Sequence, residues 1–203
     1  MDTRARIADA AYGLLVDKGY EGMTIEGIAR AAEVAPQTVY AVFRSKAGIL
    51  AELLDRTAFG PNYQELIQHA RENEHPSERL RFAARIARHI FDSQLETIDL
   101  LQGASMVTPE LAELIQDREC LRFEKQKHMI DFLAKTGWLD PSMGPDQARD
   151  ILWALTGREF YNMLVRQRKW SSQQYEGWLG DILVLSLIKE PKAMKRSQVR
   201  KKK

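Results

Sequence analysis

The segment TIEGIARAAEVAPQTVYAVFRSK, residues 24–46, decides the fold that the sequence predicts. Thr24 is a good N-cap, and the apolar residues that follow it recur at helical spacing: Ile25, Ile28, Ala29 and Ala32. Pro36 suits the first position of a second helix, because its φ is already helical and no hydrogen bond is lost there. We predict two short helices, about 24–32 and 36–42, joined by a tight turn.

The second helix has an unusual outward face. Only Val39 and Phe43 can point inward, whereas the outward residues are small or form hydrogen bonds: Gln37, Thr38, Ala41 and, at the edge, Tyr40. A helix that enters the DNA major groove needs little bulk, and needs donors and acceptors near its N-terminus. Ser45 can cap a third helix from Lys46 to about Phe59, where a lysine and free N–H groups can meet a phosphate. The residues alone leave two interpretations, a DNA-reading helix and an ordinary helical corner.

Residues 4–58 resemble the N-terminal DNA-binding domain of the TetR family of bacterial transcriptional regulators, with the helix-turn-helix at about 24–43. The matching residues are Ile7, Ala11, Lys18-Gly19-Tyr20, Met23-Thr24-Ile25, Ile28-Ala29, Ala32, Val34, Thr38-Val39-Tyr40, Phe43, Lys46 and Leu50. The rest of the chain matches the family in length and helical character. One departure is Ala35, where the family usually has a polar residue that caps the recognition helix, a cap worth roughly 1 kcal/mol.

The resemblance implies roles for this segment. The residues that would face base edges are Gln37, Thr38 and Ala41, and those that would contact phosphates are Thr24, Tyr40 and Lys46. The implied partners are a double-stranded DNA operator, a small-molecule effector and a second copy of the chain.

Helical periodicity continues along the chain, with no alternating strand pattern. We expect further helices at about 4–18, 63–70, 76–93, 98–106, 108–135, 146–169 and 172–187. Helix start signals lie at Thr108-Pro109-Glu110 and at Ser171 with Gln174. The predicted fold class is all-α with about nine helices, in which a three-helix helix-turn-helix domain, 1–60, precedes a helical ligand-binding and dimerisation domain, 61–188.

The composition is that of an ordinary globular protein. The 203 residues are 44% hydrophobic and 29% charged. No apolar run approaches the roughly 18 residues that a membrane span needs. The N-terminus has no signal-peptide core, and the single cysteine, Cys120, excludes an internal disulfide framework. We therefore expect a cytoplasmic protein.

Charge is uneven along the chain. The tail, 189–203, has eight of the 30 basic residues and one of the 28 acidic ones, which leaves 22 basic and 27 acidic residues, a net −5, in 1–188. Residues 1–58 have seven basic and eight acidic residues, so bulk charge does not argue for nucleic acid there. We expect the tail to be disordered, and either simply solvated or a source of salt-dependent attraction to phosphates.

The last two predicted helices are apolar on more than one face, so one face can pack on the core and another needs a partner. A second copy would cover it, and two recognition helices about 34 to 36 Å apart would read two half-sites. In the family these helices form a four-helix bundle across a two-fold axis. The residues expected at this interface are Ile151, Leu155, Trp178, Ile182 and Leu185. The alternative is that these helices form the core of a large monomer.

The resemblance also implies a small-molecule cavity between the core and the dimer face. The residues expected to line it are Phe91, Leu95, Met106, Phe123, Met129, Trp153, Arg158 and Tyr161. Aromatic and methionine residues at helical spacing are equally typical of plain core. The pair Arg158-Glu159 is either a buried polar anchor for a ligand or an exposed pair that bridges to the partner subunit.

The sequence has no pattern of catalytic or metal-binding residues. Its histidines, His69, His75, His89 and His128, lack metal-ligand spacing, and HExxH, GxSxG, P-loop and GxGxxG motifs are absent. We expect no enzyme activity, no metal and no cofactor. The predicted function is a sequence-specific DNA-binding transcriptional regulator that acts as a homodimeric, ligand-responsive repressor. The alternative is an all-helical protein–protein adaptor that does not bind DNA.

Overall fold

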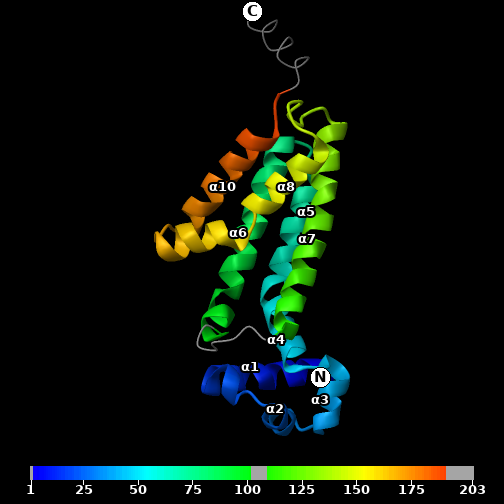
Figure 1. Cartoon of the computed structure of the whole chain (residues 1–203), viewed down its shortest axis with the longest axis vertical. Helices are drawn as coiled ribbons and strands as arrows, with labels where there is room; N and C mark the ends of the chain where they lie inside the picture. Colours follow the sequence, from blue (N-terminus) through cyan, green and yellow to red (C-terminus); the bar gives the residue numbers. More distant parts are fainter. Residues whose placement is uncertain (1, 102–108, 191–203) are drawn as a thin grey trace, which may run out of the picture. The chain divides into compact units, whose positions relative to one another are not determined.

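A computed structural model describes residues 2–101 and 109–190 (Figure 1). The helices are α1 (Thr3–Gly22), α2 (Ile25–Ala31), α3 (Pro36–Phe43), α4 (Lys46–Ala58), α5 (Pro61–Glu72), α6 (Pro76–Leu101), α7 (Pro109–Lys135), α8 (Pro145–Leu155), α9 (Arg158–Tyr161) and α10 (Ser172–Leu187). A π-helical segment, Asn162–Gln167, follows α9. Within the described ranges the regular elements are all helices, and one isolated antiparallel bridge joins Leu139 to Ile188. The all-α prediction is confirmed.

The chain divides into two compact units. The first consists of Met1–Gly60 and Ser93–Glu119, and the second of Pro61–Asp92 and Cys120–Lys203. Helices α6 and α7 therefore contribute residues to both units, whereas α1 to α4 lie wholly in the first and α8 to α10 wholly in the second.

In the first unit, α1 packs against α2 and α4, and α3 against α2 and α4. Its buried residues are Ile7, Ala8, Ala11, Leu15, Met23, Ile28, Ala29, Ala32, Val39, Phe43, Ala47, Ile49, Leu50 and Leu53. Two ion pairs join α1 to α4, Arg4 with Glu52 at 2.5 Å and Arg56 with Asp9 at 2.9 Å. Because these charged side chains are partly exposed, the apolar core supplies most of the stability.

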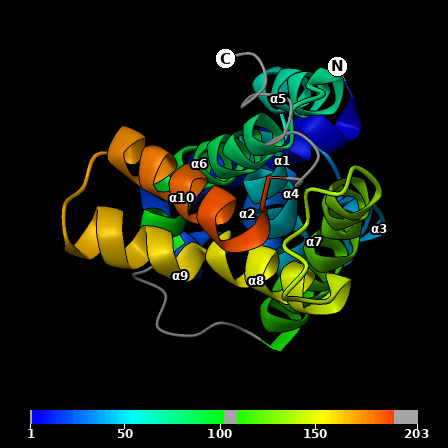
Figure 2. The same cartoon turned by 90° about the horizontal axis from the view of Figure 1, so that it is seen from above.

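The second unit has its own core, built from α6 to α10. Its buried residues are Leu80, Ala84, Ala87, Phe91, Ile130, Leu133, Ala148, Leu152, Tyr161, Tyr175, Leu179, Leu183 and Leu187. Those of α10 recur every four residues, which turns one face of that helix inward. Helices α8 and α10 pack side by side, as both views show (Figure 2). The capping box predicted at Ser171 and Gln174 is present, with both hydrogen bonds formed.

Two predicted boundaries differ from the structure because a local signal was misjudged. Helix α1 continues to Gly22, although Gly19, at φ 67°, interrupts its helical geometry where the break was predicted. The separate helix predicted at about 98–106 is wrong, since α6 runs on to Leu101. No glycine or proline lies between Ser77 and Leu101, and polar residues alone do not end a helix. The remainder of that predicted helix, and the tail from 191, lie outside the described residues.

The single helix predicted at about 146–169 is also wrong. Helix α8 ends at Leu155, and Gly157 then adopts an extended conformation, with φ −72° and ψ 161°, before α9 begins. Figure 1 shows the chain changing direction at this point, between α8 and the segment that leads to α10. The buried hydroxyl of Thr156 has side-chain partners there, which favour the break over a continuous helix.

Candidate nucleic-acid interface

Two buried side chains anchor the short helix α3. Val39 is 1% exposed and Phe43 is 5% exposed, and both lie in the same core as Ile28 of α2. The guanidinium carbon of Arg4 lies 4.7 Å from the centre of the Phe43 ring, which adds a cation–π contact. The inward face predicted from the sequence is confirmed.

The turn between α2 and α3 uses one residue in the left-handed region. Glu33 has φ 53°, and the next N–H, that of Val34, donates to the carbonyl of Ala29 at 3.0 Å. The N-cap of α3, Ala35, makes no side-chain hydrogen bond, so only its carbonyl receives the N–H of Thr38, at 2.9 Å. The missing cap that the sequence predicted is therefore a feature of the structure.

The outward face of α3 is open to solvent. Gln37 and Ala41 are exposed, Tyr40 is 51% exposed, and Thr38 is half-buried. These residues combine an amide, a phenol, a hydroxyl and a methyl group on one exposed helix of eight residues. Such a face suits direct contact with base edges in a major groove.

The two predicted caps on either side of α3 are confirmed. The hydroxyl oxygen of Thr24 accepts a hydrogen bond from the N–H of Gly27 at 3.1 Å, and that of Ser45 accepts one from Gly48 at 3.1 Å. Thr24 is exposed at the N-terminus of α2, where a phosphate could also be met. The phosphate contact itself stays a prediction.

Lys46 contacts a residue that the sequence did not suggest as its partner. Its ammonium group donates to the carbonyl of Tyr20 and lies 3.8 Å from the centre of the Tyr20 ring. Partial burial lowers the pKa of Lys46, and the nearby Glu21 carboxylate opposes that shift. The two residues are 26 positions apart, so no local spacing could have predicted their contact.

The junction between α3 and α4 is tightly packed. Arg44, which ends α3, has φ 63°, and the N–H of Ser45 donates to the carbonyl of Phe43 at 2.7 Å. A Cβ added at Gly48 would lie 2.2 Å from that same carbonyl oxygen. Only glycine allows this close approach of the two helices.

Two polar side chains bind the C-terminal half of α4 within the first unit. Arg118 of α7 donates to the carbonyl of Ala51 at 3.0 Å and to the Asp55 carboxylate at 2.7 Å. Gln94 of α6, which is only 7% exposed, donates to the carbonyl of Leu54 at 3.2 Å. Side chains from α6 and α7 thus hold the helix that follows α3.

Three of the residues predicted to line an effector cavity cluster in the second unit. Phe91 and Tyr161 are buried with ring centres 5.3 Å apart, and the guanidinium carbon of Arg158 lies 5.1 Å from the centre of the Phe91 ring. The Tyr161 hydroxyl donates to the Asp92 carboxylate at 2.5 Å. Burial, together with this carboxylate, raises the pKa of Tyr161 to about 12. These residues belong to the core.

The other predicted cavity residues do not join that cluster as one set. Phe123 and Trp153 meet edge to face with ring centres 6.3 Å apart, and Trp153 is 36% exposed. Met129 is half-buried beside the core. The side chain of Leu95 and the whole of Met106 lie outside the described residues.

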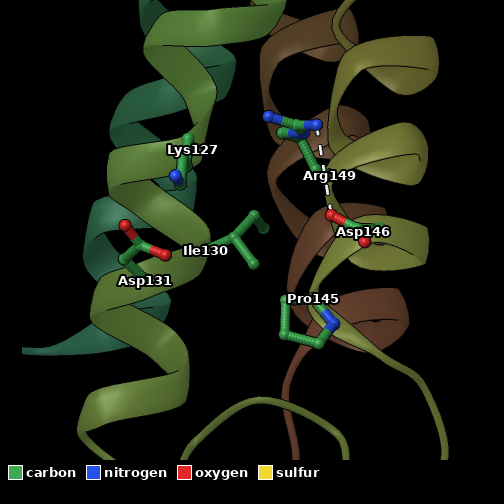
Figure 3. Close-up of a pocket in the computed structure, with 6 residues that line it drawn as sticks. All are labelled: Lys127, Ile130, Asp131, Pro145, Asp146 and Arg149. Atoms are coloured by element: carbon green, nitrogen blue, oxygen red, sulfur yellow. Dashed lines mark ion pairs between the residues drawn. The ribbon is translucent and has the colours of Figure 1, made fainter.

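A small pocket lies between α7 and the start of α8 (Figure 3). Its volume is about 40 Å³, and its lining residues are Lys127, Ile130, Asp131, Pro145, Asp146 and Arg149. It includes none of the eight predicted cavity residues. A pocket of this size has room for about one water molecule and not for an effector.

The residues predicted at a dimer interface differ in exposure. Ile151, Leu155, Trp178 and Ile182 are half-buried against the second core, whereas Leu185 is 76% exposed. In the part of the chain that the structure describes, no cluster of His, Cys, Asp and Glu could hold a metal ion. None of the described helices is long and apolar enough to cross a membrane.

Relatives of known class share both the sequence and the fold. Residues 7–53 match the family described as bacterial regulatory proteins, tetR family. The uncharacterized HTH-type transcriptional regulator YdeS of Bacillus subtilis (strain 168) is 25% identical over 172 residues, which cover 80% of this chain and 79% of YdeS.

Two solved structures have similar folds. NalD, the secondary repressor of the MexAB-OprM multidrug efflux pump in Pseudomonas aeruginosa, gives a TM-score of 0.66 at 22% identity and covers 93% of this chain and 98% of its own. The transcriptional regulator FadR from Bacillus subtilis, in complex with stearoyl-CoA, gives a TM-score of 0.65 at 18% identity and covers 89% and 97%. At these identities the likeness shows the fold.

The matched segment spans the core and the exposed face of α3 described above. The YdeS alignment extends the similarity to most of the chain, and the solved structures share its all-α architecture. Proteins of this kind bind DNA and are not enzymes. The chain belongs to the TetR family of bacterial transcriptional regulators.

Proposed function

We propose that this regulator is a ligand-responsive repressor that binds operator DNA in the cytoplasm as a homodimer, with α3 in the major groove. The supporting observation is the contrast between the two faces of α3. Val39 and Phe43 fix the helix in the core, while Gln37, Tyr40 and Ala41 are exposed. A rigid helix with a small, hydrogen-bonding outer face is what direct base readout requires.

Each exposed residue then has a role. Gln37 lies in the first turn of α3 and forms two hydrogen bonds with an adenine, while Thr38 and Ala41 contact neighbouring base edges. Tyr40 and Thr24 contact phosphates, which fix the orientation of the helix without reading sequence. For Lys46 to join them, a phosphate has to compete with the Tyr20 carbonyl for the ammonium group.

A homodimer follows from the size of α3 and from exposed apolar side chains. One helix of eight residues reads only a few bases, so two copies are needed for a specific site. In the second unit, Leu185 is 76% exposed, Met163 is 43% exposed and Trp153 is 36% exposed. A second copy that covers α8 and α10 would remove these side chains from water.

The effector site lies in the second unit. NalD is a repressor of an efflux pump, and FadR was solved with stearoyl-CoA, so related folds repress transcription and hold an apolar ligand. The effector favours a dimer whose two α3 helices are wrongly spaced for DNA, and it shifts the equilibrium only by its difference in affinity for the two forms. Since the described pocket holds about one water, effector binding requires the helices of this unit to separate.

The test is DNA binding by the native chain and by Gln37→Ala. A gel-shift assay on the DNA upstream of its own gene should give a shift, and Gln37→Ala should weaken it by about 1–3 kcal/mol, with the loss confined to one base position. Gln173→Ala, the same change at an exposed site in α10, is the matched control and should leave the affinity unchanged. No shift at low salt on any promoter DNA would favour the adaptor, and an equal loss on all sequences would exclude base reading by Gln37.

Two further measurements separate the parts of the proposal. Lys46→Ala should lower the salt dependence of binding by about one unit, because one phosphate contact is lost. An unchanged slope would leave Lys46 as a purely structural contact of Tyr20. Light scattering should give a mass of twice 23.3 kDa for the native chain, and a mass of 23.3 kDa at assay concentrations would contradict the homodimer.

A further inference from the structure

Four polar side chains converge where α8 ends in the second unit. Arg122 and Gln126 come from α7, Thr156 from the break after α8, and Tyr175 from α10. We call these residues the polar cluster. Thr156 is 5% exposed and Tyr175 is fully buried. Sequence reasoning missed the cluster, because its members come from three helices.

Thr156 uses all of its hydrogen-bonding capacity. Its hydroxyl donates to the Leu152 carbonyl at 2.7 Å, and it accepts from Arg122 Nη1 at 2.9 Å and from Gln126 Nε2 at 2.8 Å. A hydroxyl has one proton to donate and two lone pairs, so no further bond is possible. Because the proton goes to Leu152, the Gln126 atom that faces Thr156 has to be the nitrogen.

The other end of the Gln126 amide is therefore fixed as an acceptor. Gln126 Oε1 is buried and has no hydrogen-bond partner among the described residues. A buried carbonyl oxygen without a partner is rare, since its loss of hydration costs stability. It needs a donor that the described part of the chain does not supply.

Tyr175 has the complementary need. Its hydroxyl is buried and likewise has no partner within the described ranges, while its ring packs edge-on against Tyr161 with centres 5.2 Å apart. Burial is the main cause that raises the pKa of Tyr175, Tyr161 and Glu159 raise it further, and Arg122 lowers it. The phenol is thus a neutral donor and acceptor within reach of both an arginine and a glutamate.

The surroundings favour an uncharged ligand group. Arg122 already donates to Thr156 and to the Trp153 carbonyl at 3.0 Å, and Glu159 brings a negative charge to the same phenol. The opposite charges balance, so neither a carboxylate nor an ammonium group gains from burial there. Phe123 and Trp153 pack beside the arginines of this face, which provides apolar contact surface.

We infer that the polar cluster recognises the head of an uncharged effector that presents a hydroxyl or carboxamide group to Gln126 and Tyr175 and an apolar body to Phe123 and Trp153. This inference rests on the proposed effector function. A hydroxyl or carboxamide donates to Gln126 Oε1 and accepts from the Tyr175 hydroxyl. A carboxylate has no proton to donate, and a hydrocarbon has neither group. Gly157 and the π-helical segment after it let this part of the chain open.

The first test compares four probes of the same ring size on the full-length protein: benzyl alcohol, benzamide, benzoate and toluene. Tryptophan fluorescence should report binding, because Trp153 lies beside Arg122. Benzyl alcohol and benzamide should bind at least about tenfold more tightly than benzoate and toluene, as loss of one buried hydrogen bond predicts. Equal binding of all four, or binding of none, would overturn the inference.

The second test compares two buried tyrosines in ring contact. Tyr175→Phe removes a hydroxyl without a partner among the described residues, so the melting temperature should rise by about 2–4 °C, while benzyl alcohol affinity falls about tenfold. Tyr161→Phe removes a hydroxyl bonded to Asp92, so the melting temperature should fall. If Tyr175→Phe lowers the melting temperature like Tyr161→Phe, a buried water is the partner of Tyr175 and the inference is wrong.

Operator binding keeps the two proposals distinguishable. Tyr175→Phe should bind operator DNA as the native chain does, because Tyr175 lies in the second unit and α3 in the first. Intact DNA binding without selectivity among the probes would refute only the polar cluster. Absence of DNA binding by the native chain would refute the proposed function.

Discussion

Replacing Gly48 by alanine tests the close packing between α3 and α4. A methyl group at this position would lie 2.2 Å from the carbonyl oxygen of Phe43 and 3.3 Å from its carbonyl carbon. Both neighbours are backbone atoms at the end of α3, so no flexible side chain can move aside. A contact below 3.0 Å requires the two helices to separate by about 0.8 Å, the difference between 3.0 and 2.2 Å.

The size of the effect follows from two opposing contributions. Alanine is preferred to glycine inside a helix by about 1 kcal/mol. Overpacking of a tight site costs about 1–3 kcal/mol, and rigid backbone neighbours favour the upper end. We expect Gly48→Ala to lower the free energy of unfolding by about 2 kcal/mol, which corresponds to a fall in melting temperature of about 4–8 °C.

Gly13→Ala is the matched control. Gly13 lies exposed within α1, and a Cβ there would meet no atom within 4 Å. It should therefore show the helix preference alone, a gain of about 1 kcal/mol. Thermal unfolding of both variants by circular dichroism, followed by operator titration, measures the outcome. If Gly48→Ala stabilises the chain as Gly13→Ala does, the junction is looser than described and the reasoning fails.

Three other changes follow from single features. Ala35→Ser should add the missing cap of α3 and raise the free energy of unfolding by about 1 kcal/mol in urea titrations, whereas no gain would mean that the turn cannot present a hydroxyl to the N–H groups. Because the pKa of Tyr161 is raised from 10.0 to about 12, the unfolded chain loses this proton first as pH rises. Stability should therefore fall between about pH 10 and 12, and less steeply in Tyr161→Phe, and equal slopes would remove Tyr161 as the cause. Leu185→Glu should shift the chain toward monomer in light scattering without lowering its helix content, and an unchanged mass would exclude this face from the interface.

Much of the first unit was predictable because its signals are local. Caps at Thr24 and Ser45, the proline at 36 and the buried pair Val39 and Phe43 all depend on residues a few positions apart. The exposure of Gln37 follows from the same spacing, since a helix with two anchors leaves its opposite face to solvent. The resemblance then supplied the biological class.

The second unit was less predictable because its signals are tertiary. The break after α8 appears in the sequence only as one glycine, Gly157, inside an apolar pattern, and such a glycine does not by itself end a helix. The contact of Lys46 with Tyr20 and the polar cluster around Thr156 join distant parts of the chain. The predicted cavity residues Phe91 and Tyr161 pack on each other, since aromatic spacing does not separate core from cavity lining.

Helix α4 acts as a lever because it is gripped at one end and bonded to the DNA-reading helix at the other. Its thirteen residues span about 20 Å at the standard rise. A tilt of about 6° around the end held by Arg118 and Gln94 would move Ser45 by about 2 Å. Hydrogen bonds to bases tolerate only a few tenths of an ångström, so a rotation too slight to disturb the core is sufficient to abolish base recognition.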